Sequence, residues 1–405
     1  MLTPREALAT ILDAVGPLAS TEVDLADALG RILAEDIVST ESIPPFVNSA
    51  MDGYAVLGAD LAAAPVKLRV MGDRAAGSVG SEVVVRGTAL RIMTGAAMPA
   101  GADTVVPVEL TAREGAVVEI LKAVKTGLNI RQAGEDVREG ETVLTVGTLL
   151  RPSELGLLAA LGRPRVRVLP PPVVAVVTTG DELVDVGAAL DPGQIRDANL
   201  HSLCAQVRAC GAIPLPIGRV RDDAATLEAA LRDALERADA VITNGGISMG
   251  EYDHIRPVME RLGIRQLFWQ VAQKPGKPMA FSLAGEKPIF GVPGNPVSAL
   301  ICFEEYVRPA LRKIMGQALL FRPERTAHWA EPQKKSADDR RVHFHRVTLK
   351  EEEGQLWASS TGPQGSGILT SMTRANALAL LAAESFDVKR GDPVTVHLMD
   401  QPEDH

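Results

Sequence analysis

Three stretches of the chain join a short apolar run to a loop of small residues: VVAVVTTGDEL (173–183), AVITNGGISMGEYD (240–253) and PIFGVPGNPVSAL (288–300). Their β-branched runs are typical of strands buried on both faces of a parallel sheet. Helical patterns alternate with these strands along the chain, and such alternation indicates a mostly parallel, doubly wound sheet. Loops at the carboxyl ends of such strands form the ligand crevice. The sequence therefore predicts an α/β domain and the edge at which its site lies.

The rest of this region continues the same alternation. We expect further strands near 213–217, 279–283 and 288–292, and helices near 199–210, 224–238, 296–314 and from about Asp253. Asp222 or Asp223 is in position to cap the helix that begins at 224. The three prolines at 170–172 form a rigid boundary, so the α/β domain is predicted to span 169–318.

The sequence on either side of this α/β region shows different patterns of apolar residues and glycines. Short Val-rich runs separated by glycines predict an inserted β-domain at 46–137. The segments 1–45 and 138–168 mix helical and strand patterns, and we expect them to form one linker domain. The helical period is lost towards the C-terminus, which predicts a β-barrel-like domain at 319–405. The predicted fold class is a multidomain α/β protein.

Composition restricts the classes of partner and the location. A formal net charge of −9 over 405 residues argues against nucleic acid or an anionic membrane as the main partner. No apolar run approaches the ~18 residues of a membrane span. The start MLTPREALATILDAV is expected to be an amphipathic helix with Thr3 as N-cap and Glu6 completing a capping box, not a signal peptide. The three cysteines form no CxxC pair and are expected to be free thiols, so a cytoplasmic location is predicted.

Several loops carry groups suited to an anion. KPGKP holds Lys274 and Lys277 on a stiff frame near the predicted crevice, although lysines are usually solvated. DDRRVHFHR brings Arg341 and Arg346 together, and arginine binds oxyanions through paired hydrogen bonds; exposed charges on a strand are the alternative. NGGISMG and VPGNP offer backbone N–H groups, but without a Walker lysine or GxGxxG spacing a nucleotide-binding P-loop is disfavoured. These loops add Gly245, Gly246, Ser248, Pro293, Asn295 and Pro296 to the candidate substrate-binding residues.

Acidic side chains accompany the same loops. Asp181 and Glu182 of TTGDEL are expected at a helix start, where helix capping is the alternative role. Asp253 follows the glycine-rich loop, and carboxylate oxygens are the ligands that Mg²⁺ prefers. His343 and His345 share one face of a predicted strand, with no third ligand at zinc-site spacing, so zinc is disfavoured.

Three further candidates lie outside the α/β domain. Asp52 precedes a glycine in NSAMDGYAV, Thr94 precedes a glycine in RIMTGAA, and Asp136 lies in AGEDV. A hydroxyl or carboxylate at such a position can approach a ligand. Taken in isolation, each of them is more typical of an ordinary turn.

Taken in order along nearly the whole chain, these strings resemble the molybdopterin molybdenumtransferase family, which includes the E-domain of gephyrin. The matching stretches are PPFVNSAMDGYAV, RIMTGAAMPAGADTVV, NIRQAGEDVREG, VVTTGDEL, TNGGISMGEYD, KPGKP, GVPGNPVSAL and QGSGILTSMTRANALALL. The family often has a lysine shortly before KPGKP where this chain has Gln270, which removes one expected basic contact. Arg196 and Leu57 are milder departures.

The resemblance implies an enzyme that inserts molybdenum from molybdate into adenylylated molybdopterin, with Mg²⁺ as cofactor and AMP as product. It implies a four-domain protomer, an elongated homodimer with its crevice at the dimer interface, and molybdopterin adenylyltransferase and molybdoenzyme chaperones as further partners. It adds Ser366 to the substrate-binding residues, and it marks as catalytic Asp52, Thr94, Asp136, Glu182, Asp222 and Asp253. Within that set, the expected magnesium ligands are Glu182, Asp222 and Asp253.

Two other functions fit parts of the pattern. A related nucleotide-processing enzyme, either a molybdopterin adenylyltransferase or a dinucleotide pyrophosphatase, would share the α/β domain. The additional β-domains at 46–137 and 319–405 argue against a compact adenylyltransferase. A gephyrin-like interaction scaffold would not need a charged crevice. The residues whose retention favours the transferase over a scaffold are Asp52, Thr94, Glu182, Asp253 and the KPGKP lysines.

Overall fold

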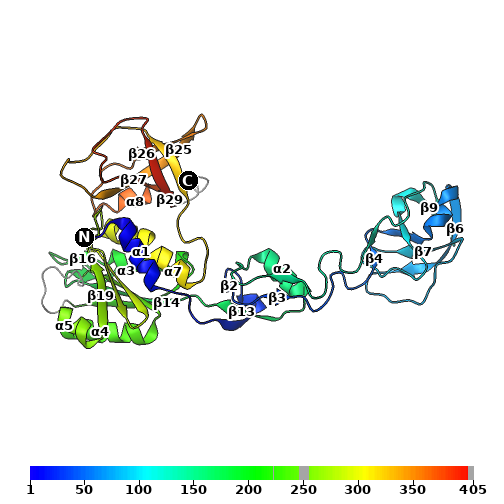
Figure 1. Cartoon of the computed structure of the whole chain (residues 1–405), viewed down its shortest axis with the longest axis horizontal. Coiled ribbons are helices and arrows are strands. Elements are labelled where there is room, and N and C mark those ends of the chain that lie inside the picture. The colour runs from blue at the N-terminus through cyan, green and yellow to red at the C-terminus, as the bar shows by residue number, and fades with distance from the viewer. Residues whose placement is uncertain (222, 246–254, 400–405) are drawn as a thin grey trace. The chain divides into compact units, whose positions relative to one another are not determined.

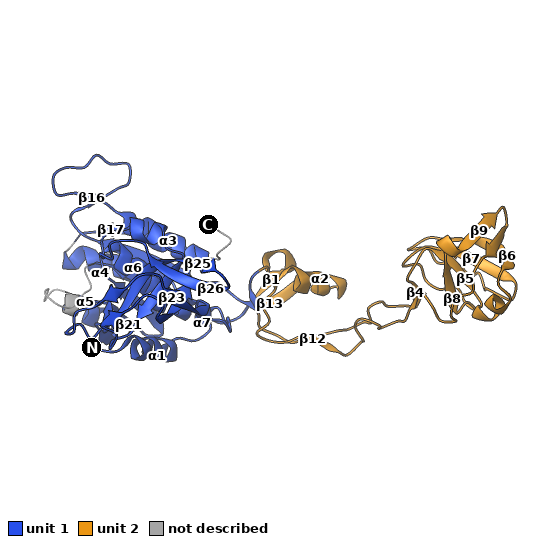
Figure 2. Cartoon of the chain, turned by 90° about the horizontal axis from the view of Figure 1, so that it is seen from above, with its two compact units in different colours: residues 1–21, 30–32, 168–405 blue, residues 22–29, 33–167 orange. Residues whose placement is uncertain are grey.

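The chain divides into two units, and the computed structural model describes all of its residues except 222, 246–254 and 400–405 (Figure 1). Unit 1 comprises Met1–Thr21, Gly30–Ile32 and Val168–His405, and unit 2 comprises Glu22–Leu29 and Leu33–Arg167 (Figure 2). Each unit is described separately below.

Unit 1 is built on a parallel sheet with an antiparallel edge. Its strands are β14 (Val173–Thr179), β17 (Ile213–Val220), β18 (Ala240–Asn244), β19 (Ile264–Trp269), β21 (Ala280–Ala284) and β22 (Lys287–Val292). They form one six-stranded sheet in the order β17-β14-β18-β22-β21-β19. The first four strands in this order run parallel, as predicted. β21 runs antiparallel to β22, because the short turn between them forms a hairpin, and it also runs antiparallel to β19.

Helices cover both faces of this sheet. They are α1 (Pro4–Ala14), α3 (Ala198–Ala209), α4 (Ala224–Arg237), α5 (Ile255–Arg261), α6 (Pro296–Cys302) and α7 (Arg308–Ile314). Val174 and Val176 of β14 pack in a core with α1, α3, α6 and α7, whereas Ala175 and Val177 pack in a second core with α4 and α5. This two-sided burial explains the uninterrupted apolar run of β14 and confirms the doubly wound fold.

Two helix ends follow the sequence expectations and one helix departs from them. At α1, the N–H of Thr3 donates to Glu6 Oε2 at 2.8 Å and the N–H of Glu6 donates to Thr3 Oγ1 at 3.3 Å, which is the predicted capping box. At α4, Asp223 is the N-cap and accepts from the N–H of Thr226. The helix expected at 296–314 is interrupted by a π-helical turn, Phe303–Val307, between α6 and α7. Within the part of the chain that the structure describes, no helix has the length and apolar character needed to cross a membrane.

The C-terminal region of unit 1 is a closed barrel, as predicted. Its strands are β23 (Glu324–Trp329), β25 (Val342–Glu352), β26 (Gln355–Ser360), β27 (Ala377–Leu381) and β29 (Pro393–Leu398). Pairing runs from β25 through β26, β23, β29 and β27 back to β25, which closes the barrel. The short strand β20 (Gln273–Lys274) extends this sheet beside β25, and the remaining elements are β15 (Leu183–Val184), β16 (Ile195–Arg196), β24 (Gln333–Lys334), β28 (Asp387–Val388) and α8 (Thr370–Thr373).

Unit 2 contains a six-stranded sheet and a smaller group of elements. The sheet has the order β8-β5-β7-β6-β10-β9, with β5 (Gly53–Val56), β6 (Val66–Arg74), β7 (Thr88–Ile92), β8 (Thr104–Pro107), β9 (Thr111–Glu114) and β10 (Val117–Ile120). The smaller elements of unit 2 are β3 (Ile37–Val38), β4 (Asn48–Ser49), β11 (Ile130–Arg131), β12 (Thr142–Leu144), α2 (Pro152–Ala160) and the 3-10 turns Leu25–Asp27, Gly58–Ala63 and Val108–Leu110. Three further strands have residues in both units: β1 (Thr21–Asp24), β2 (Ile32–Leu33) and β13 (Arg165–Leu169). The two apolar clusters on the six-stranded sheet use residues between Tyr54 and Ile130 only.

Candidate active site

A cavity of about 720 Å³ lies where the α/β domain meets the C-terminal barrel, and both belong to unit 1. The α/β domain contributes the KPGKP loop and the start of α6, and the barrel contributes β25 and the loop after β26. Strand β20 explains this meeting, because it pairs in parallel with β25, Gln273 opposite Val342 and Lys274 opposite His343. The cavity thereby brings together six predicted substrate-binding residues: Lys274, Lys277, Asn295, Arg341, Arg346 and Ser366.

The KPGKP loop rests on a buried polar cluster. Gln273 is fully buried, and its Nε2 donates to the carbonyl oxygens of Pro275 at 3.2 Å and Gly276 at 3.3 Å. The hydroxyl of Tyr306 donates to the Oε1 of Gln273. Gly276 has a φ of +92°, and a Cβ at that position would lie 2.6 Å from Cys302 Sγ. The backbone of the loop is therefore held from beneath, while its two lysines remain exposed.

The wall of the cavity is strongly basic. Its cationic lining residues are Lys274, Lys277, Lys334, Lys335, Arg341 and Arg346, and its one acidic lining residue among those described is Asp339. Within the described residues, the ammonium groups of Lys274 and Lys277 form no hydrogen bond or ion pair. These two lysines are thus available to a ligand.

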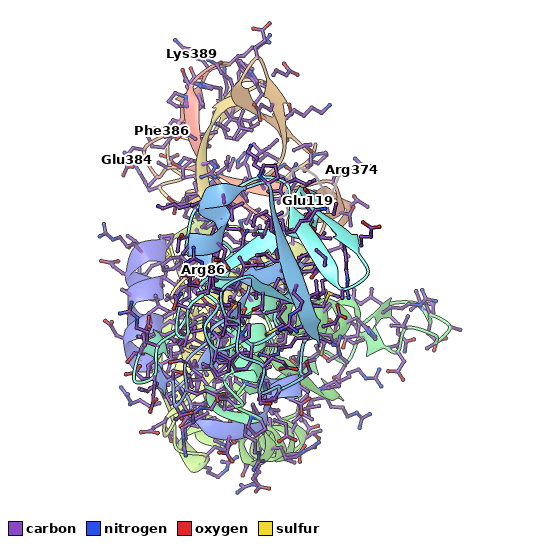
Figure 3. The ribbon with its side chains drawn as sticks, turned by 90° about the vertical axis from the view of Figure 1, so that its right-hand side faces the viewer. Arg86, Glu119, Arg374, Glu384, Phe386 and Lys389 are labelled. Atoms are coloured by element: carbon purple, nitrogen blue, oxygen red, sulfur yellow. The ribbon has the colours of Figure 1, made fainter. Side chains whose placement is uncertain are left out.

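Lys335 differs from Lys274 and Lys277 because backbone carbonyl oxygens already accept hydrogen bonds from its ammonium group. It is 7% exposed, and its ammonium donates to the carbonyl oxygens of Arg341, Ala382 and Ala383 at 3.1, 2.6 and 2.7 Å. The same ammonium lies 5.1 Å from the centre of the ring of Phe386, which is labelled in Figure 3. Its three N–H donors are therefore all in use, and Lys335 contributes positive potential to the cavity but no free donor.

Arg346 of β25 is the most deeply buried cation of the cavity, with 1% of its surface exposed. Its Nε donates to Ser371 Oγ at 3.1 Å and its Nη2 donates to the carbonyl oxygen of Gly365 at 3.1 Å. No carboxylate pairs with it among the described residues, and burial lowers its pKa to about 10. A guanidinium with this pKa stays charged at neutral pH, so it is a fixed and uncompensated positive charge.

The loop that carries Ser366 is tied to the start of α6. The N–H of Val297 donates to the carbonyl oxygen of Ser366 at 3.1 Å. The hydroxyl of Ser366 forms no hydrogen bond within the described residues. Asn295 holds the N-cap position of α6 but makes no side-chain capping bond, and Pro296 opens the helix. The side chains of Asn295 and Ser366 are both among those that line the cavity.

Asp339 forms a charged cluster inside the cavity. Its carboxylate accepts from Arg341 Nε and Nη2, both at 2.7 Å, and from His343 Nε2 at 2.9 Å. Hydrogen bonds from Arg341, more than any other cause, hold the pKa of Asp339 far below its usual range. The predicted anion-binding residue Arg341 therefore already has an anionic partner.

His345 lies on β25 between His343 and Arg346 in the sequence, and it also lines the cavity. Its ring stacks on that of His343 with 5.9 Å between centroids and meets Trp329 edge-on at 5.8 Å. Its Nδ1 is buried without a hydrogen-bond partner. Burial, followed by the positive charges of neighbouring residues, lowers the pKa of His345 to about 4. The imidazole is therefore neutral at physiological pH.

A second cleft of about 610 Å³ lies at the carboxyl ends of β14 and β17. Its lining residues are Gly180, Asp181, Gln194, Arg219, Val220, Arg221 and Asp223. The expectation that Asp181 and Glu182 begin a helix is wrong, because β15 follows them, pairs with β16, and delays the next helix until Ala198. Glu182 is exposed and folds back over Gly180, where a Cβ would lie 2.7 Å from its Oε2.

The ends of the parallel strands converge through side-chain amides. Asn244 ends β18, and its Nδ2 donates to the carbonyl oxygen of Pro293 at 2.6 Å. Asn199 of α3 donates to Asn244 Oδ1 at 2.8 Å and to the carbonyl oxygen of Gly294 at 2.7 Å. Gly245 has a φ of +79°, and a Cβ there would lie 2.8 Å from a backbone oxygen of β14. The predicted loop residues Gly245 and Pro293 thus lie together at the carboxyl ends of the parallel strands β18 and β22.

Some predicted residues lie outside the described part of the chain: Asp222, Gly246, Ser248 and Asp253. Among the described residues, no three His, Cys, Asp or Glu side chains form a group able to hold a metal ion. Glu182 is the one predicted magnesium ligand that the structure describes, and its exposed carboxylate has the oxygen donors that Mg²⁺ prefers.

Asp52 and Thr94 form a pair within unit 2. The N–H and the hydroxyl of Thr94 both donate to Asp52 Oδ1 at 2.7 Å. These bonds, the backbone bond first, lower the pKa of Asp52. Asp136 is exposed elsewhere in unit 2, and within the described residues no hydrogen bond joins its side chain to Asp52 or Thr94.

Sequence reasoning missed several residues of the first cavity, and four of them matter for its charge and support. They are Gln273, Lys335, Asp339 and His345. DDRR is typical of a solvated loop, and nothing in the sequence marks one of its aspartates as a cavity residue. The position of Gln273 beside Lys274 was the one available signal, because a strand leading into KPGKP alternates a buried with an exposed side chain.

The fold and these clefts define an enzyme with a doubly wound α/β domain and a basic cavity, suited to an anionic substrate. Three family models match the chain: the MoeA N-terminal region (domain I and II) at 2–162, a probable molybdopterin binding domain at 175–313, and the MoeA C-terminal region (domain IV) at 332–399.

Full-length relatives agree with these matches. The molybdopterin molybdenumtransferase of Haemophilus influenzae is 38% identical and covers 98% of both chains, and that of Bacillus subtilis is 34% identical over 93% of this chain and 89% of its own. Two crystal structures of a Pyrococcus horikoshii molybdopterin biosynthesis MoeA protein have TM-scores of 0.84 and 0.80 at 31% and 32% identity. They cover 99% and 98% of this chain and 100% of their own. The chain belongs to the molybdopterin molybdenumtransferase family and is a transferase.

Proposed function

We propose that this enzyme inserts molybdenum from molybdate into adenylylated molybdopterin, with Mg²⁺ as cofactor and AMP as the released product. The observation that carries the proposal is the buried guanidinium of Arg346, which has no carboxylate partner among the described residues. Burying an unpaired charge is costly, so a bound anion is the natural counter-charge. A doubly charged tetrahedral oxyanion suits the basic cavity, and family membership supports molybdate as that oxyanion.

We assign the substrate-binding residues to two groups. Lys274, Lys277, Arg341, Arg346 and Ser366 hold the oxyanion by charge and by hydroxyl donation. The strand-end loops bind the phosphate-bearing pterin through backbone N–H groups, and their residues are Gly245, Gly246, Ser248, Pro293, Asn295 and Pro296. Together these groups bring the oxyanion to the reacting sulfurs of the pterin, which is a positioning role.

We assign the magnesium ion in this proposal to three acidic residues. Glu182, Asp222 and Asp253 would hold it, and the bound ion would supply neutralising charge to the pyrophosphate. Glu182 supports this role because its carboxylate is exposed beside the second cleft and forms no hydrogen bond within the described residues.

The remaining assignments rest on family membership. Asp52, Thr94 and Asp136 take part in catalysis, and the exposed Asp52–Thr94 pair retains a free carboxylate oxygen for this purpose. The chain acts as a cytoplasmic homodimer that meets molybdopterin adenylyltransferase and molybdoenzyme chaperones. Its domains divide at 1–45 with 138–168, 46–137, 169–318 and 319–405. Analytical ultracentrifugation of the purified chain tests the dimer.

Arg346→Lys tests the central assignment. Lysine keeps the charge but cannot make the guanidinium's paired bonds, so we expect molybdate affinity and molybdate-dependent AMP release to fall by about a hundredfold. The assay combines purified protein, adenylylated molybdopterin, Mg²⁺ and molybdate. Arg374→Lys, at an exposed position of the same barrel (Figure 3), is the matched control and is expected to behave as wild type. Equal rates in the two variants, or no AMP release from the wild type, would contradict the proposal.

A further inference from the structure

Asp339 is the one carboxylate among the described residues that line the basic cavity. Its side chain is 13% exposed, and the Arg341 side chain that pairs with it is 31% exposed. The two parallel 2.7 Å bonds from Arg341 have the geometry that arginine adopts with a bound oxyanion. The third bond, from His343 Nε2, occupies another donor of the same wall. A carboxylate is thus already bound to two of the side chains that could donate to an anion in the cavity.

A purely local role for Asp339 would leave this arrangement unexplained. Asp338, the preceding residue, has the same charge, is exposed, and lines a neighbouring pocket but not this cavity. The N–H of Arg341 also donates to Asp339 Oδ1 at 3.3 Å, and this short turn would form equally well with a neutral asparagine. The charge of Asp339 therefore has no role in the turn itself and acts on the cavity.

We propose that Asp339 is an internal anion that occupies Arg341 and His343 in the empty cavity and that an entering oxyanion must displace. This inference rests on the proposed function of the cavity as the oxyanion site. In this role Asp339 holds the side chains of Arg341 and His343 in place when no substrate is bound. It also repels every anion that enters, and so it sets the anion affinity of the site. The carboxylate is ionised throughout the physiological range, because its pKa is far below that range.

The direction in which oxyanion affinity changes, when Asp339 loses its charge, separates this proposal from a positioning role for Asp339. An entering dianion meets the repulsion of Asp339 and competes with it for Arg341, and both effects weaken binding. Asp339→Asn removes the charge while keeping the size and one oxygen acceptor, so the oxyanion should bind more tightly. If Asp339 instead served to aim Arg341 at the substrate, loss of its charge would weaken binding.

Isothermal titration of the full-length chain with molybdate, and with sulfate as an unreactive probe, measures the effect. We expect Asp339→Asn to bind both dianions at least about tenfold more tightly than wild type. Asp338→Asn, which changes the net charge of the protein equally, should leave both affinities within about twofold. Circular dichroism and thermal melting of each variant show that the fold is retained.

The outcomes separate the two proposals. If molybdate affinity does not depend on Arg346, the proposed function of the cavity fails. If affinity depends on Arg346 but Asp339→Asn binds no more tightly than Asp338→Asn, the cavity is the oxyanion site and the internal-anion role is wrong. Weaker binding in Asp339→Asn would also overturn it, in favour of a positioning role.

Discussion

Burial lowers the pKa of two basic side chains of β25, but only one of them loses its charge at neutral pH. Arg346 keeps its charge, because burial lowers its pKa only to about 10. His345 loses its charge, because burial together with the cations around it lowers its pKa from 6.5 to about 4. The charged groups that act on it are His343 and Arg346 on its own strand, Lys274 on β20, and Lys335 after β24. A cavity can therefore place a neutral ring among fixed positive charges.

The depressed pKa of His345 predicts a pH-dependent stability. Between about pH 6.5 and pH 4 the unfolded chain binds a proton that folded His345 does not, so the free energy of unfolding falls as pH falls through this window. The loss approaches about 3 kcal/mol at the lower end. His345→Gln should remove that part of the slope. Urea unfolding followed by tryptophan fluorescence is a suitable measurement, because Trp269, Trp329 and Trp357 all lie in unit 1.

The control for this prediction is His201→Gln, at an exposed position of α3. It should leave the dependence of stability on pH as in the wild type. An unchanged slope in His345→Gln would show that its imidazole is not held neutral in the folded protein.

At the scale of elements, the KPGKP loop depends on one glycine. Gly276 has a φ of +92°, and a Cβ there would lie 2.6 Å from both Cys302 Sγ and Gln273 Nε2. Gly276→Ala should therefore lower the free energy of unfolding by about 2–3 kcal/mol and weaken molybdate binding, because the displaced loop carries Lys274 and Lys277. Chemical unfolding and molybdate titration measure the two effects.

Gly285→Ala is the matched control for this loop. Gly285 also has a positive φ, +60°, but a Cβ there would meet nothing within 4 Å. It should cost about 1 kcal/mol for the backbone alone and leave molybdate affinity unchanged. Equal costs for both variants, with equal affinities, would show that the contacts beneath KPGKP do not hold the loop.

The elements of the α/β domain could be predicted because short stretches of sequence indicate which residues are buried and where a helix begins. The unbroken apolar run of β14 follows from cores on both of its faces, and Asp223 at α4 is a local capping signal. The turn at Asp181 and Glu182 was mispredicted because the pairing of β15 with β16, and not the local sequence, decides where the next helix begins. The pairing of Asp339 with Arg341 escaped prediction because a charged run is equally typical of a solvated loop.

At the scale of the whole molecule, the segment 46–137 has the properties of a self-contained insertion. Its sheet and both of its apolar clusters are formed by its own residues. The chain enters and leaves it side by side: Ile43 and Val137 form an isolated antiparallel bridge, with N–H to O distances of 2.8 and 3.1 Å. A segment with its own core and adjacent ends is expected to fold independently.

Excision tests this independence and separates binding from chemistry. The fragment 46–137 alone should unfold in one cooperative transition by circular dichroism, because no residue outside it contributes to its cores. The complementary chain, with 45 joined to 138 through a short Gly-Ser linker, should keep full molybdate affinity, since every residue that lines the basic cavity belongs to unit 1. It should lose AMP release, because it lacks Asp52, Thr94 and Asp136. Retained AMP release would remove these three residues from the proposed catalytic set, and an unfolded fragment would show that the insertion depends on the rest of the chain.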